Sequence, residues 1–234
     1  MILSIWDKGK LKKQDLSELK TAFSIDHVDS YPEYTKIFCW YISPQESGES
    51  LLFDISLVEV LTNGVSVLTI SQSKTGVQDA VQEALTSQTY ASISVAGRVI
   101  YLTMVHLLQA YERFVEYLEG YADKVESMIP PWPRQFYTEV FNIRKEGSHL
   151  LRLTRHFKIL AEALENGNVH IHFTDDEKRL LDIVYERAVS AEETTETTLE
   201  DIRDLISLHL DTMSHDMNRA MRLIAMVTAI VAVP

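Results

Sequence analysis

The sequence predicts a small α/β domain followed by long antiparallel helices and one very long C-terminal stalk helix. Three observations support this mostly helical α+β fold. Residues 1–90 hold short β-branched and aromatic runs separated by turn signals, residues 91–172 hold two long stretches with helical spacing of apolar residues, and residues 173–234 hold no Gly or Pro before Pro234. We therefore divide the chain into an α/β domain (1–90), two long helices (91–172) and a stalk helix (173–234).

The α/β domain should contain four strands, formed by its runs of β-branched and aromatic residues. These runs are Met1–Trp6, Thr35–Ile42, Leu51–Leu61 and Val65–Ser71. Asn63-Gly64 separates the last two and predicts a hairpin, because both residues tolerate a positive φ. Asp15-Leu16-Ser17-Glu18 has the spacing of a capping box and predicts a short helix that ends near Phe23.

Proline and glycine mark the ends of the two helices that follow. The first should run from about Gly97 to Met128, and Pro130-Pro131-Trp132-Pro133 ends it, because proline lacks an N–H donor and clashes with the preceding turn. The second should run from about Arg134 to Glu165, where Asn166-Gly167-Asn168 ends it. Gly147 lies inside this second helix and need not interrupt it.

The stalk helix has a clear start. Thr174-Asp175-Asp176-Glu177 has capping-box spacing, in which Thr174 and Glu177 satisfy two backbone amides that have no partner within the helix. A helix from Asp175 to Val233 would be roughly 85–90 Å long at about 1.5 Å per residue. That length exceeds any small domain, so the helix must pack on something along most of its length.

Charge and composition exclude some functions. The net charge of −12 argues against nucleic acid as a partner, because phosphates require a basic surface, and it is compatible with binding cations. The single Cys39 excludes an internal disulfide. The sequence has no Gly-rich phosphate loop, no G-x-S-x-G elbow and no H-E-x-x-H motif, and we therefore predict that the protein is not an enzyme.

Two stripes of residues run along the stalk helix at spacings of three and four. The polar stripe is Glu200, Asp204, Ser207, Asp211, Ser214, Asn218 and Met221, and the stripe beside it is Leu199, Ile202, Ile206, His209, Met213 and Met217. One interpretation is an amphipathic helix with a core face and a solvated acidic face. In a symmetric oligomer, however, the polar stripe would line the axis, and each carboxylate would become a ring that suits a hydrated Mg²⁺.

The end of the stalk helix is apolar. From Leu223 to Val233 every residue is apolar or Thr, but a membrane-spanning helix needs about twenty such residues. The segment is either a buried helix that closes a soluble core or the first part of a truncated transmembrane helix.

The sequence around Asn218 carries a family resemblance. Asn218-Arg219-Ala220-Met221-Arg222-Leu223-Ile224, followed by small and aliphatic residues and a proline, resembles the entry into the first membrane helix of the CorA family of divalent-cation channels. Ser214, Asn218, Met221 and Arg222 match the family pattern. Ile224-Ala225 stands where the family has Leu-Thr, Pro234 lies one residue late, and the family's Gly-Met-Asn signature is not in this chain.

The resemblance implies a function and an assembly. The chain would be the cytosolic and pore-entrance part of a channel that passes divalent cations, Mg²⁺ first, with Co²⁺, Ni²⁺ and Zn²⁺ as further candidates. It would form a homopentamer in the cell membrane, with this region in the cytoplasm and gating by cytosolic metal. The alternative is a soluble, acidic, helical protein that responds to metal or serves as a scaffold.

The resemblance also assigns candidate site residues. Asn218 and Met221 would be pore positions, with Thr228 two turns further on and Asp204, Ser207, Asp211 and Ser214 above them. Simple helix packing is the alternative role for Met221. Asp182 and Glu186 are candidate ligands of a regulatory metal between subunits, with Glu192, Glu193 and Glu196 as further candidates, although most of these carboxylates could equally form a solvated face.

Overall fold

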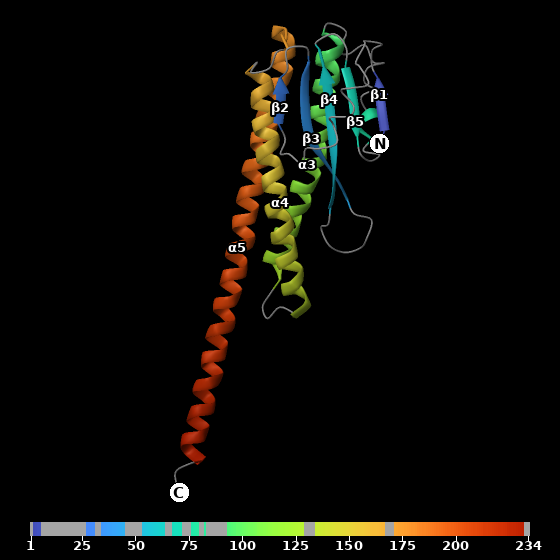
Figure 1. Ribbon diagram of the computed structural model, residues 1–234. Helices are drawn as coiled ribbons and strands as arrows, with labels where there is room; N and C mark the ends of the chain where they lie inside the picture. The colour runs from blue at the N-terminus through green and yellow to red at the C-terminus, as the bar shows by residue number, and fades with distance from the viewer. Residues whose placement is uncertain are drawn as a thin grey trace.

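In the described part of the chain, a small antiparallel sheet lies beside one end of three long helices, which extend well past it (Figure 1). The computed structural model describes residues 2–5, 27–30, 34–44, 53–63, 67–71, 76–79, 82, 93–128, 134–166 and 171–231. The third long helix extends well past the other two, and the C-terminus lies at its far end. The mostly helical α+β fold that the sequence predicts is confirmed.

Within the described residues the sheet has five strands in the order β1-β5-β4-β3-β2, and every neighbouring pair is antiparallel. Its strands are β1 (Ile2–Ile5), β2 (His27–Ser30), β3 (Thr35–Pro44), β4 (Phe53–Thr62) and β5 (Val67–Ser71). Thr62 pairs with Val67, as the predicted hairpin requires. The four predicted strands are confirmed, and β2 is an additional edge strand. The helix predicted from Asp15 lies outside the described residues.

Helix α3 (Val95–Ser127) packs against the sheet through aromatic contacts. The hydroxyl of Tyr111 donates a hydrogen bond to the backbone carbonyl of Trp40 over 2.5 Å. His106 stacks on the ring of Tyr41, with ring centroids 5.8 Å apart. These contacts fix α3 to β3, so that the sheet and the helices share one continuous core.

Helix α4 (Arg134–Glu165) returns antiparallel to α3 and buries the face that its periodicity predicts. Its large buried apolar residues are Phe136, Val140, Ile143, Leu150, Leu153, Phe157, Leu160 and Leu164. Gly147 lies on this face without interrupting the helix. A Cβ atom there would lie 2.7 Å from the side chain of Leu199 and 3.2 Å from that of Leu118. Glycine therefore permits the close approach of α4 to both other helices.

Helix α5 (Asp175–Val231) is the predicted stalk helix. Its 57 residues correspond to about 85 Å of helix. It packs along both α3 and α4 through buried positions that recur at helical spacing, among them Leu181, Val184, Ala188, Leu199, Ile202 and Ile206. The predicted capping box is present, because the Glu177 N–H donates to Thr174 Oγ1 over 3.3 Å and the Thr174 N–H donates to Glu177 Oε2 over 2.8 Å.

Glu177 also joins the starts of two helices. Its Oε1 atom accepts hydrogen bonds from the backbone N–H of Ser94 (2.9 Å) and from the Ser94 hydroxyl (2.6 Å). Ser94 Oγ in turn accepts from the N–H of Gly97 in the first turn of α3 (2.9 Å). Burial raises the pKa of Glu177, but the hydrogen bonds from Ser94 and Thr174 outweigh it and hold the pKa below its usual value.

Gly97 is required by this junction, which gives a testable prediction. A Cβ atom at Gly97 would lie 2.2 Å from Glu177 Oε1, whereas one at Gly120, in the same helix, would meet nothing within 4 Å. We expect Gly97→Ala to lower the free energy of unfolding by about 1–3 kcal/mol. Gly120→Ala should raise it by up to about 1 kcal/mol, because alanine favours the helix. Urea unfolding followed by circular dichroism measures both, and equal effects of the two substitutions would contradict the role of Gly97.

Candidate functional site

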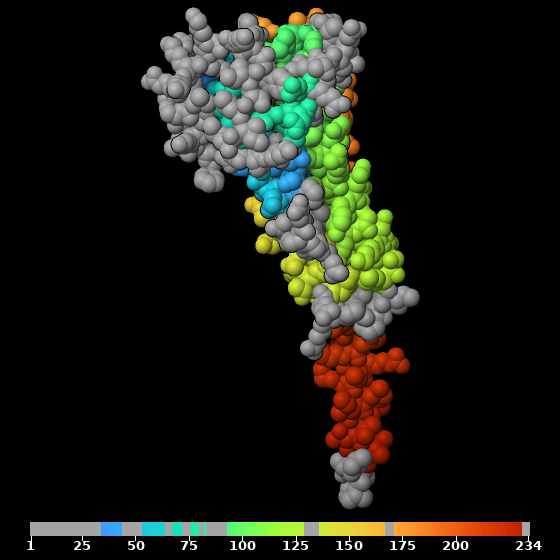
Figure 2. All heavy atoms as spheres, turned by 90° about the vertical axis from the view of Figure 1, so that its right-hand side faces the viewer, coloured from blue at the N-terminus to red at the C-terminus, as the bar shows by residue number. Residues whose placement is uncertain are grey.

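The last part of α5 leaves the rest of the molecule. The hydroxyl of Tyr137, in the first turn of α4, contacts the imidazole of His209 and donates to Met213 Sδ over 2.9 Å. His209 is only 2 % exposed, and burial lowers its pKa. Every position from 211 to 230 is exposed. Figure 2 shows this segment projecting beyond the other described residues, and Figure 1 shows it as a single helix.

The predicted polar stripe lies on the exposed side of α5. Its seven residues, Glu200, Asp204, Ser207, Asp211, Ser214, Asn218 and Met221, are all exposed. The neighbouring stripe is divided. Met213 and Met217 are exposed, whereas its earlier members are buried against the other helices, namely Leu199, Ile202, Ile206 and His209. The division arises because α4 begins at Arg134. Tyr137, in its first turn, contacts His209 and reaches Met213, and no described element of the chain lies opposite the stripe beyond Met213.

The stripe begins earlier than the sequence interpretation placed it. Glu186, Ser190, Glu193 and Thr197 precede Glu200 at the same spacing of three and four, and all are exposed. Carboxylates and small hydroxyl residues thus alternate over the upper half of α5. The same periodicity could have revealed this extension in the sequence. We call the full set, from Glu186 to Thr228, the α5 stripe.

Hydroxyl side chains on the α5 stripe donate hydrogen bonds to backbone carbonyls of their own helix. Ser207 Oγ donates to the carbonyl of Arg203 (3.0 Å), and Thr228 Oγ1 donates to the carbonyl of Ile224 (2.8 Å). Each oxygen therefore retains lone pairs that can accept hydrogen bonds from water. Met221 is 55 % exposed, so packing in the core of its own chain does not explain it.

The end of α5 is apolar around its circumference. Leu223, Ile224, Met226, Val227 and Ile230 are each more than half exposed, and they point in several directions because they follow one another on the helix. An apolar surface of this kind marks a site of contact with another apolar phase or another chain. Within the described residues, no helix has an apolar stretch long enough to cross a membrane.

The upper carboxylates of α5 divide into two groups. Asp182, Glu186 and Glu193 are exposed. Glu192, in contrast, is buried and accepts from Arg155 Nε over 3.0 Å and from Lys158, while Glu196 accepts from Arg155 over 2.7 Å. Burial raises the pKa of Glu192, but the hydrogen bonds from Lys158 and Arg155 outweigh it and hold the pKa below its usual value. Glu192 and Glu196 therefore fasten α5 to α4.

No complete metal site lies within one copy of the described chain. Among the residues that the structure places, His, Cys, Asp and Glu form no group of three that could hold an ion. Asp182 and Glu186 lie one turn apart on the exposed side of α5 and would need ligands from outside the chain. A second ion pair, from Arg187 to both carboxylate oxygens of Glu112 (3.0 and 2.6 Å), fastens this part of α5 to α3.

Comparisons with known proteins identify a family and several structures that are similar to this chain. The family model described as "CorA-like Mg2+ transporter protein" matches residues 7–234. The complete structure of the CorA magnesium transporter from Methanocaldococcus jannaschii is similar over 96 % of this chain and 70 % of that one, with a TM-score of 0.81 and 17 % identity. The full-length CmaX protein is similar over 96 % of this chain and 68 % of that one, with a TM-score of 0.79 and 17 % identity.

A cytoplasmic domain shares the fold as well. The ZntB cytoplasmic domain from Vibrio parahaemolyticus is similar over 89 % of this chain and 80 % of that one, with a TM-score of 0.66 and 11 % identity. No curated protein sequence matches the chain. At these identities the structural likenesses establish the fold, and the family follows from the match along nearly the whole sequence. The resemblance around Asn218 is thereby confirmed: the chain belongs to the CorA-like Mg²⁺ transporter family.

Proposed function

We propose that the chain forms the cytosolic part and the pore entrance of a channel that passes hydrated divalent cations, with Mg²⁺ before Co²⁺, Ni²⁺ or Zn²⁺. The observation that carries the proposal is the α5 stripe, a line of carboxylate, hydroxyl and amide oxygens that is exposed along the longest helix. Members of the family are transporters rather than enzymes. The family match also favours this function over a soluble scaffold.

The proposed pore requires several copies of α5 around one axis, with a pentamer as the expected number. Each carboxylate of the α5 stripe then becomes a ring, and the rings raise the local concentration of cations. Mg²⁺ gives up its water reluctantly, so it would pass with its hydration shell and bind through that shell. The small residues between the carboxylates, such as Ser190, Thr197, Ser207 and Ser214, would leave room for this water.

Asn218 would act at the mouth of the membrane. Its amide oxygen accepts hydrogen bonds from the water around a cation and adds no fixed charge that would trap the ion. Met221 and Thr228 follow on the same stripe and would narrow the path below it. The exposed apolar end of α5 supports its insertion into a membrane, with the sheet and the three helices on the cytoplasmic side.

Asp182 and Glu186 would bind a regulatory cation between neighbouring copies. Both are exposed on α5, and a site there would gain its remaining ligands only when copies meet. A cation in such a site would relieve repulsion between acidic helices of neighbouring copies and favour the state in which the pore is closed. This is gating by cytosolic metal.

Substitution of Asn218 tests the pore. In the membrane-inserted protein, Asn218→Ala should lower Mg²⁺ uptake into vesicles by about fivefold, equivalent to one hydrogen bond of about 1 kcal/mol. Thr212→Ala is the control, because Thr212 is also exposed but lies about 120° around the helix from Asn218. Its uptake should match the wild type at equal protein abundance. Unchanged uptake by the Asn218→Ala protein would remove Asn218 from the pore, and no uptake by the wild type would favour the scaffold function.

A further inference from the structure

The outward side of α4 is an unusual surface for a soluble helix. Two large apolar side chains, Phe141 and Ile159, are 57 % and 54 % exposed there. Between them the exposed positions include Lys145, Ser148 and Arg152, and none of the fully exposed positions from 141 to 159 is a carboxylate. We call the set Phe141, Lys145, Ser148, Arg152 and Ile159 the α4 outer face. It is basic and partly apolar in a chain whose net charge is −12.

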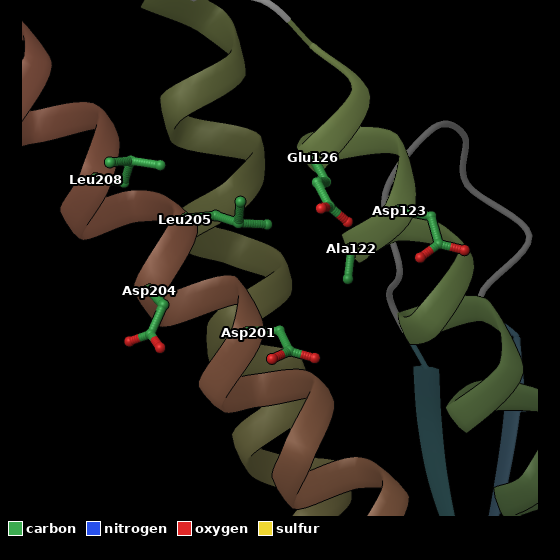
Figure 3. Close-up of a pocket in the computed structure, with 7 residues that line it drawn as sticks. All are labelled: Ala122, Asp123, Glu126, Asp201, Asp204, Leu205 and Leu208. Carbon is green, nitrogen blue, oxygen red and sulfur yellow. The ribbon is translucent and has the colours of Figure 1, made fainter.

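Two hollows of opposite character lie between α3 and α5, and we call them together the α3–α5 groove. Its upper part, a hollow of about 250 Å³, is lined by Glu112, Glu116 and Glu119 from α3 and by Arg187, Ser190 and Thr194 from α5. Its lower part, a hollow of about 410 Å³, is lined by Asp123, Glu126, Asp201, Asp204, Leu205 and Leu208 (Figure 3). Arg187 is engaged by Glu112, so the α3–α5 groove keeps a strong negative charge.

The groove and the α4 outer face point to opposite sides of the molecule. In Figure 3 the lower hollow faces the viewer, and α4 passes behind α5. Ser190 and Asp204 belong both to the groove and to the α5 stripe, so the groove opens beside the stripe. If the stripe faces an axis, one flank of each copy is therefore the groove and the other flank carries α4.

The two surfaces also lie at the same level along the helices. Lys124 of α3 pairs with Glu139 of α4 at 4.0 Å, and Tyr111 of α3 stacks edge-on against Phe157 of α4 at 5.3 Å. Residues 139–157 of α4 therefore run alongside residues 111–124 of α3. Lys145 and Arg152 fall within this span, as do the groove carboxylates from Glu112 to Asp123.

We propose that the α4 outer face of one copy docks into the α3–α5 groove of the next copy. This inference rests on the ring proposed above and names the contact that builds it. Copies in a ring are related by rotation alone, so a head-to-tail contact needs complementary surfaces on opposite flanks at equal height. Lys145 and Arg152 then meet the carboxylates of the groove, which sets the register and the choice of partner.

Charge reversal tests the contact in the purified chain. Lys145→Glu with Arg152→Glu should shift the mass measured by light scattering from the assembly to the 26.8 kDa of one chain. Arg113→Glu with Lys178→Glu makes the same charge change at exposed positions outside both surfaces and should leave the assembly intact. Adding Glu116→Lys and Glu119→Lys to the first variant should restore assembly. Wild-type mass for the first variant, or failure of the restoring pair, would overturn the proposal.

A disulfide provides a second test that is independent of ion flux. Ser148 follows Gly147, which packs beside Leu118, and Glu119 follows Leu118, so the two exposed positions lie at one level on opposite flanks. Ser148→Cys with Glu119→Cys should form disulfides between copies, visible as a ladder on a non-reducing gel, whereas Ser148→Cys alone should give at most dimers. An assembled protein without the ladder would refute this contact and leave the proposed channel standing. A cross-linked ring that fails to take up Mg²⁺ would support this contact and argue against the proposed channel.

Discussion

Replacing Phe157 by Ala is expected to lower the free energy of unfolding by about 3–5 kcal/mol, because it opens a cavity at the centre of the fold. Phe157 is fully buried in α4, and its ring meets that of Tyr111 at 81°. Tyr111 is itself buried in α3 and bonded to the carbonyl of Trp40. The substitution thus removes the ring that packs against Tyr111, the residue that joins α3 to the sheet.

Urea unfolding provides the measurement, and Tyr117→Ala provides the control. Tyr117 lies in α3, 44 % exposed, and its loss should cost less than about 1 kcal/mol. A cost at Phe157 no greater than that at Tyr117 would show that α4 does not contribute to the same core as the sheet. A two-step unfolding curve for the Phe157→Ala protein would show instead that the sheet and the helices unfold separately.

The helical half of the fold could be predicted from local chemistry. Proline after Met128 and the Asn-Gly-Asn segment after Glu165 bound α3 and α4, and the Thr174–Glu177 capping box starts α5. Each of these signals acts within a few residues, so a single sequence suffices to find it. Helical spacing of apolar residues also predicts the buried face of α4, and the eight large apolar residues that follow this spacing, from Phe136 to Leu164, are all buried.

Contacts between residues far apart in the sequence could not be predicted from it. Glu177 was expected to cap its own helix, but it also accepts two hydrogen bonds from Ser94, 83 positions earlier. Strand β2, His27–Ser30, has only four residues with no run of β-branched side chains, and it exists as a strand because β3 pairs with it. No local pattern encodes either feature, since both depend on which elements the tertiary fold brings together.

The sequence predicted that the stripe residues share one side of α5, but it was not used to place the start of the stripe at Glu186. Periodicity placed Asp204 through Met221 on one stripe, and the structure exposes all of them. The α3–α5 groove could not be foreseen, because its carboxylates come from helices whose pairing appears only in the fold. Glu192 was a candidate ligand by its place on α5, yet its burial between Arg155 and Lys158 makes it structural. The sequence alone does not show which acidic side chains form ion pairs within the fold.

Reversing the charge of Asp211 should nearly abolish Mg²⁺ uptake, with a decrease of about tenfold or more. In the proposed pore, Asp211→Lys replaces a ring of carboxylates with a ring of ammonium groups, which repels a divalent cation at the position where it should accumulate. Asp216→Lys is the matched control, because Asp216 is exposed on the same helix but lies about 140° around it from Asp211. Uptake into vesicles would be measured at equal amounts of inserted protein. If both variants lose uptake equally, the effect is one of overall charge, and the α5 stripe does not face the ions.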